Sequence, residues 1–133
     1  MRRMGPTYDF GHFRLDTADE LLFCEGRRVH LTLKAIEILR VLIENAGHVV
    51  EKDELMSSCW PDSFVEEANI AENVCMIRRA LGDARHTPEY IETVHRRGYR
   101  FIAPVSMKVQ APEAVPQRAQ DWKTGAPQLL TSI

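Results

Sequence analysis

The order in which hydrophobic periodicity changes along the chain constrains its fold more than any other feature. Residues 8–31 place apolar side chains in short runs between turn residues, which is typical of antiparallel strands. Residues 32–81 repeat apolar side chains at helical spacing, and residues 90–103 return to alternation. The sequence therefore predicts an α+β fold with an antiparallel sheet of up to four strands, then three helices, then a C-terminal β-hairpin.

Capping and stop residues divide the helical part into three helices. The first is predicted over about 32–46, the second over about 51–59 and the third over about 67–81. Thr32 has the side chain of a helix N-cap, and Gly82 follows the third helix as a stop.

Length and composition allow one domain followed by a tail. At 133 residues with 44% apolar side chains, the chain can bury one ordinary core. We assign residues 6–104 to that domain. Residues 105–133 hold several Pro, Gln and Ala residues without a sustained period, so they are expected to be a linker or disordered tail. No run approaches the ~20 apolar residues of a membrane span, and no signal peptide is evident, so a soluble, cytoplasmic protein is expected.

The sequence lacks the motifs of enzymes and metal proteins. It has no phosphate loop, no glycine-rich dinucleotide motif and no nucleophile with a recognisable partner base. Its three cysteines, Cys24, Cys59 and Cys75, are widely spaced and have no His at a metal-ligand spacing, so reduced thiols are expected. We therefore predict no catalysis, no metal and no cofactor.

The predicted helix over 67–81 has one apolar and one polar face. The apolar positions recur at i, i+4, i+7 and i+11, which are Ile70, Val74, Ile77 and Leu81. The opposite face is expected to present Asn69, Glu72, Asn73, Met76 and Arg79, with Arg78 beside them. Asn can bond adenine in the major groove of DNA, and arginines can hold phosphates. An ordinary amphipathic surface helix would give the same pattern.

The predicted hairpin has a basic tip, residues 95–99. The side chains that could meet a ligand there are His95, Arg96, Arg97 and Tyr99. DNA phosphates or a minor groove would attract such a compact cation, and Tyr99 could stack or donate its hydroxyl to a phosphate. A solvated charged turn is the alternative for the hairpin alone. Because the hairpin follows a groove-sized helix, the combination favours a winged helix-turn-helix DNA-binding domain.

Several segments resemble the OmpR/PhoB-type effector domain of transcription regulators. Residues 90–101 resemble its wing, residues 77–83 the end of its recognition helix, and residues 31–39 and 47–50 its first helix and the following turn. The resemblance covers roughly residues 6–104 in the right order. It implies a four-stranded N-terminal sheet, three helices and a wing, with sequence-specific binding to double-stranded DNA. It also implies transcription regulation of the bacterial phosphorelay and signal-transduction type.

The resemblance implies roles for single residues. Base-facing positions fall on Asn69, Asn73 and Met76. Backbone or wing positions fall on Arg78, Arg79, Thr93, Arg96, Arg97 and Tyr99. Glu72, Cys75 and Met76 stand where many members carry basic residues, which predicts modest affinity per monomer.

The resemblance also implies partners and an arrangement. The loop around Trp60–Val65 corresponds to the part that touches RNA polymerase, and the family usually binds direct repeats as head-to-tail dimers. A DNA-binding domain at the N-terminus followed by a polar linker is similar to CadC/ToxR-like regulators. Only seven residues precede Tyr8, so no phosphoacceptor receiver domain is expected before it.

A second interpretation stays open on the sequence alone. The net charge is −2, and residues 51–72 hold seven acidic side chains against Lys52 alone. The same fold could therefore be a protein-interaction module that uses the acidic second helix and loop without binding DNA. Indifference to DNA and to the removal of Arg96 and Arg97 would identify such a module.

Overall fold

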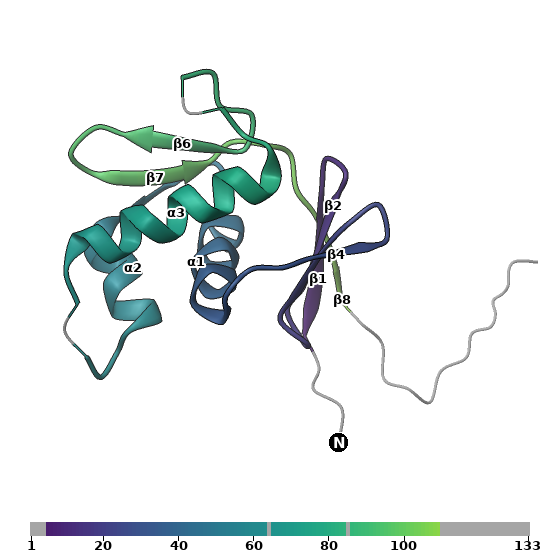
Figure 1. Cartoon of the computed structure of the whole chain (residues 1–133), viewed down its shortest axis with the longest axis horizontal. Helices are drawn as coiled ribbons and strands as arrows, with labels where there is room; N and C mark the ends of the chain where they lie inside the picture. Colours follow the sequence, from purple (N-terminus) through teal and green to yellow (C-terminus); the bar gives the residue numbers. More distant parts are fainter. Residues whose placement is uncertain (1–4, 64, 85, 110–133) are drawn as a thin grey trace, which may run out of the picture.

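The computed structural model describes residues 5–63, 65–84 and 86–109, and it has the predicted order of strands, helices and hairpin (Figure 1). The helices are α1 (Leu33–Glu44), α2 (Lys52–Cys59) and α3 (Glu67–Leu81). The strands are β1 (Pro6–Phe10), β2 (Phe13–Asp16), β3 (Leu21–Cys24), β4 (Arg27–Val29), β5 (Val49–Glu51), β6 (Ile91–Val94), β7 (Gly98–Phe101) and β8 (Ser106–Val109). The predicted α+β winged-helix class is confirmed.

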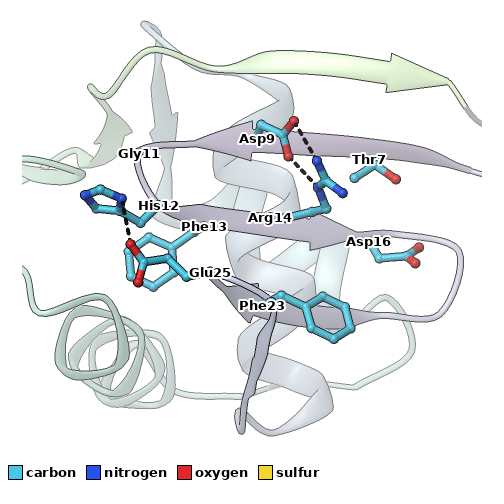
Figure 2. Close-up of a pocket in the computed structure, with 10 residues that line it drawn as sticks. Thr7, Asp9, Gly11, His12, Phe13, Arg14, Asp16, Phe23 and Glu25 are labelled. Atoms are coloured by element: carbon cyan, nitrogen blue, oxygen red, sulfur yellow. Dashed lines mark hydrogen bonds and ion pairs between the residues drawn. The ribbon is translucent and has the colours of Figure 1, made fainter.

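The N-terminal sheet is antiparallel and its strands lie in the order β4-β3-β2-β1-β8. Its inner face buries Tyr8, Phe10, Leu15 and Leu22 against the helices, as the alternation of apolar side chains requires. Its outer face is mostly polar, although Phe23 of β3 lies there opposite Arg14. There Asp9 lies opposite Arg14 across the β1–β2 pair, and the two side chains are bonded at 2.8 Å (Figure 2).

Strand β8 was not predicted. Residues 106–109 were assigned to a linker or disordered tail, and that assignment is wrong because β8 pairs with β1 from Asp9↔Ser106 to Pro6↔Val109. An edge strand is held by backbone hydrogen bonds and can leave its side chains in water, so it carries little hydrophobic pattern. Met107, for example, is exposed. The domain therefore extends at least to Val109, and residues 110–133 lie outside the described part of the chain.

The helices lie close to their predicted limits, although α1 ends at Glu44, two residues before the predicted end at about 46. Thr32 caps α1 and accepts a hydrogen bond from the Ala35 amide at 3.2 Å. Glu51 and Glu54 form a reciprocal capping box at the start of α2. Helix α3 ends at Gly82, whose φ of +70° is a left-handed conformation that favours glycine. None of the described helices is long and apolar enough to cross a membrane.

A second sheet, in the order β5-β7-β6, holds the wing to the helices. Val49–Glu51, which we expected only to lead into the second helix, forms β5 and pairs with β7. The wing also joins the N-terminal sheet through an aromatic cluster. The ring centroids of Phe10 and Phe101 are 5.2 Å apart, and those of Phe13 and Tyr90 are 5.6 Å apart. One core therefore fixes the wing relative to α3.

Candidate nucleic-acid interface

Helix α3 has an exposed ridge of mostly small side chains. Its buried side consists of Ile70, Val74, Ile77 and Leu81, as predicted. The exposed ridge opposite consists of Ala68, Ala71, Glu72, Cys75 and Arg79. These residues follow one another at helical spacing and therefore share one face of the helix.

The predicted base-facing residues are not all on this ridge. Asn73 was expected on the exposed face, and that expectation is wrong: it is only 9% exposed, and its Nδ2 donates to the Asn69 carbonyl at 2.7 Å. Position 73 lies next to Val74 and one turn after Ile70, so the helix turns it toward the core. Asn69 is exposed in the first turn, and its Nδ2 donates to the Glu66 carbonyl at 3.4 Å.

Met76 lies on another side of α3 from the wing. It is half-buried and borders a groove with the segment before α1, next to Leu31 and Thr32. A side chain in this position is close to the N-terminal end of α1. Contact between Met76 and a base thus remains a prediction, and the geometry does not single the residue out.

Arg78 joins α3 to the wing. Its Nη2 donates to the Ile91 carbonyl at 3.0 Å and to the Thr93 hydroxyl at 2.6 Å. Its Nε is the one buried side-chain polar atom in the described residues that lacks a partner. Because these contacts commit the guanidinium to β6, Arg78 is better suited to fixing the wing than to holding a phosphate.

Asp83, which sequence reasoning did not single out, organises the loop between α3 and β6. Its carboxylate accepts hydrogen bonds from the amides of Glu89 (2.6 Å), Tyr90 (3.3 Å) and Ile91 (2.9 Å). Burial raises the pKa of the Tyr90 hydroxyl, and the carboxylates of Glu89 and Asp83 raise it further. A Gly-Asp pair after a helix was the available signal, since Asp side chains often bond nearby backbone amides in turns.

The wing tip presents two arginines in different ways. The turn closes through the Arg97 amide, which donates to the Val94 carbonyl at 3.0 Å, and Arg96 takes a left-handed φ of +64°. The Arg97 guanidinium lies 3.4 Å from a Glu51 carboxylate oxygen. Arg96 and His95 are exposed, and within the described ranges neither side chain has a bonded partner. Arg96 is therefore the freer of the two cations.

The ridge of α3 and the wing meet around a shallow hollow. Its lining comes from both elements and comprises Ala71, Cys75, Arg78, Arg79, Asp83, Thr93 and Tyr99. Thr93 is exposed, whereas Tyr99 is only 9% exposed and mostly part of the core. Arg79 is exposed, and its Nη2 lies 3.8 Å from the Cys75 sulfur. The structure thus brings Arg78, Arg79, Thr93 and Tyr99 together, as the wing hypothesis requires.

Another hollow lies on the outer face of the N-terminal sheet (Figure 2). Four of its side chains form two pairs, Asp9 with Arg14 and His12 with Glu25 at 3.3 Å, and Asp16 accepts hydrogen bonds from the amides of the following turn. Arg14 holds the pKa of the Asp9 carboxyl below its usual value. No group of three metal-ligating side chains occurs in the part of the chain that the structure describes.

The loop around Trp60–Val65 lies beyond α2. Trp60 packs partly against the core, and the Lys34 ammonium sits 5.1 Å from the centroid of its ring. Residues 61–63 are exposed, and Phe64 is outside the described residues. Residues 61–63 thus form a short exposed segment after α2.

Comparison with known proteins links this geometry to gene regulation. A family whose description is "Transcriptional regulatory protein, C terminal" matches residues 26–101, more than half of the chain. The transcriptional regulator HilA of Salmonella typhimurium is 34% identical over 96 residues, which is 72% of this chain and 17% of that protein. The transcriptional activator CadC of Escherichia coli is 30% identical over 101 residues, or 75% of this chain and 20% of CadC. The chain therefore spans about a fifth of the length of these relatives.

Solved structures show the same fold. The DNA-binding domain of E. coli CadC aligns with a TM-score of 0.67 and 26% identity, covering 77% of this chain and 97% of that one. The response regulator DrrB, an OmpR/PhoB homologue from Thermotoga maritima, aligns with a TM-score of 0.66 and 36% identity. That alignment covers 72% of this chain and 44% of DrrB.

Proposed function

Because this chain belongs to the family of transcriptional regulatory protein C-terminal domains, we propose that it binds double-stranded DNA sequence-specifically and regulates transcription. Helix α3 enters the major groove, and the wing, residues 95–99, lies on the adjacent backbone or minor groove. The observation that carries this proposal is the single surface on which the α3 ridge, Arg79 and the Thr93 side of the wing surround one hollow. The CadC relative, whose solved domain is described as DNA-binding, supports it.

The ridge of α3 suits a groove. The major groove of B-DNA is about 12 Å wide and admits an α-helix. Ala68, Ala71 and Cys75 are short, so base edges can approach the helix closely. Asn69 lies in the first turn, where an exposed amide can bond an adenine edge. Arg79, nearly three turns further along, can reach a phosphate.

The wing supplies the second contact. Arg96 is an exposed cation at the hairpin tip with no bonded partner among the described residues, and His95 is exposed beside it. Arg97 forms an exposed ion pair with Glu51. Such a pair contributes little stability in water, so Arg97 can exchange Glu51 for a phosphate. Thr93 and Tyr99 supply the wing's part of the hollow between α3 and the wing.

The proposal includes partners and a place of action. The exposed segment after Trp60 is suited to contact RNA polymerase, and two copies are expected to bind direct repeats head to tail. Both rest on the family resemblance of the sequence. A domain that reads bacterial promoters acts in the cytoplasm. Residues 6–109 suffice for DNA binding in this account, since they contain the core, α3 and the wing.

Fluorescence anisotropy on a mixed-sequence duplex across a salt series tests the proposal. We expect the binding constant to fall with salt, by a log–log slope of about 0.9 for each phosphate neutralised. Arg79→Ala/Arg96→Ala should bind at least tenfold more weakly, and its slope should be smaller by about two. The control Arg14→Ala/Arg40→Ala removes the same charge from β2 and α1 and should bind like the wild type.

Two results would argue against the proposal. Equal losses of affinity in both double variants would mean that DNA binding depends only on the net charge of the protein. If circular dichroism shows that the chain is folded and it binds no DNA even at low salt, the protein-interaction module is favoured instead.

A further inference from the structure

We infer that Glu72 determines sequence specificity: its carboxylate accepts a hydrogen bond from the N4 amino group of a cytosine in the major groove, and it opposes binding to duplexes that lack this base. The inference rests on the proposed function and deepens it by naming the base that α3 selects. It starts from an acidic side chain in the middle of an otherwise small and basic ridge, Ala68, Ala71, Glu72, Cys75 and Arg79.

Nothing around Glu72 stabilises its charge in the free protein. Its carboxylate makes no hydrogen bond or ion pair within the described residues, and it is exposed. The side chains one turn away in either direction, Ala68, Asn69, Cys75 and Met76, carry no positive charge. The helix dipole favours an acid only in the first turn of α3, and position 72 lies beyond that turn.

Most other acids near the interface have partners, and Glu66, which has none among the described residues, is the N-cap of α3, where the helix dipole favours an acid. Glu51 pairs with Arg97, Glu67 with Lys52 at 3.3 Å, and Glu92 with Arg100. Asp83 accepts backbone amides. These acids hold elements together, whereas Glu72 contributes to no contact that the structure describes. Its position is therefore better explained by what approaches the ridge.

Among the ridge residues, Glu72 has the only side chain that is both long and a hydrogen-bond acceptor. Ala68 and Ala71 offer only methyl groups, and Cys75 a short thiol. In the major groove, cytosine presents the N4 amino donor, and carboxylates accept from it. The alanine methyl groups can contact a thymine methyl beside it. Adenine also presents an amino donor there, but beside its N7 acceptor, which repels a carboxylate. Glu72 is thus suited to cytosine.

The same carboxylate penalises the wrong sequence. Near DNA it approaches a dense row of phosphates and loses water, and both changes cost free energy unless an amino group meets it. A duplex with cytosine at the matching position offsets this cost, and other duplexes do not. Glu72 therefore gives specificity partly by repulsion.

Selection from a randomised duplex library, followed by anisotropy on the selected duplex and its single-base variants, tests this inference. The wild type should select a cytosine at one position and discriminate against its replacement about tenfold. Glu72→Gln should lose that preference, with adenine replacing cytosine, and should bind mixed-sequence duplex several-fold more tightly. Asp62→Asn, which removes one negative charge from the exposed loop after α2, should change neither property.

The outcomes separate this inference from the proposed function. If the wild type and Glu72→Gln select the same sequence with the same discrimination, Glu72 does not determine specificity, although DNA binding stands. If Asp62→Asn tightens mixed-sequence binding as much as Glu72→Gln and the base preference is unchanged, charge alone acts and the inference is overturned. If no variant selects any sequence, the proposed function fails, and the role of Glu72 fails with it.

Discussion

Gly98 is the wing residue with the least freedom to change. A Cβ at this position would lie 2.9 Å from the Glu51 Cα and much closer still to the Val50 carbonyl oxygen, because β7 passes β5 here. Gly98 does not adopt a left-handed φ, so the requirement is one of space and not of backbone conformation. The close approach of β5 and β7 is what holds the wing against the start of α2.

At this scale we predict that Gly98→Ala lowers the free energy of unfolding by about 3 kcal/mol, because the two strands must separate. Gly26→Ala is the matched control. Gly26 has a φ of +85° and nothing within 4 Å of the added methyl group, so only backbone strain of about 1 kcal/mol is expected. Urea unfolding measures both variants, and equal losses would contradict the steric explanation.

At the scale of elements, two side chains set the position of the wing relative to α3. Arg78 reaches from the helix to the Ile91 carbonyl and Thr93 hydroxyl of β6. Asp83 binds the amides of the segment that leads into β6. In the proposed binding mode, a helix in one groove and a hairpin on the adjacent backbone must keep a fixed separation. We therefore expect these bonds to contribute to binding, although neither side chain needs to touch DNA.

We predict that Asp83→Ala lowers the free energy of unfolding by about 2 kcal/mol, because three backbone amides lose their acceptor. It should also weaken DNA binding under conditions in which circular dichroism shows the variant folded. Asp83→Asn keeps one oxygen acceptor and should recover part of both losses. A folded Asp83→Ala variant with wild-type affinity would show that the loop does not position the wing.

The outer face of the N-terminal sheet has its own ion pairs, and one of them reaches β8. Asp9 of β1 bonds Arg14 of β2, and its carboxylate lies 3.7 Å from the Lys108 ammonium of β8. The hydrogen bond from Arg14 holds the pKa of Asp9 below its usual value. A carboxyl whose pKa is lower in the folded state stabilises the fold above its unfolded-state pKa, about 3.9, and this stabilisation disappears as pH falls through the folded-state pKa.

We predict that the difference in stability between the wild type and Asp9→Asn depends on pH. The variant should be less stable than the wild type at pH 7, and the difference should shrink as the pH is lowered through the acidic range, since a protonated Asp9 resembles Asn. Thermal unfolding of both proteins between pH 7 and pH 3 measures this. A difference that stays constant over the range would show that the Asp9 charge does not stabilise the sheet.

The sequence predicted elements with a strong side-chain period and missed contacts made by the backbone. The helical spacing of apolar residues from Ile70 to Leu81, with Gly82 after them, predicted the limits of α3. Alternating apolar residues on either side of two arginines predicted the wing. Strands β5 and β8 are short and bond mainly through the backbone, so their residues gave little pattern. Asn73 was misplaced because a helical face is wide, and a residue beside the core ridge can turn inward.

At the scale of the whole molecule, the charges show why the interface must be local. The net charge is −2, and many cations are paired, as Arg14 is with Asp9, Arg40 with Glu44 and Arg100 with Glu92. The field of the whole chain therefore does little to attract DNA. In the proposed binding mode, Arg79, Arg96 and an exchangeable Arg97 neutralise about three phosphates per copy. We therefore expect modest affinity for one copy and a preference for two copies on adjacent sites.

The most direct test of the central claim, that α3 and the wing form the DNA-binding surface, is an amide NMR titration of the chain with duplex DNA. We predict that the largest chemical-shift changes occur at residues 68–79 and 94–97, with little change at residues 52–63, which form α2 and the start of the loop after it. Changes concentrated on residues 52–63, with α3 and the wing unaffected, would contradict it.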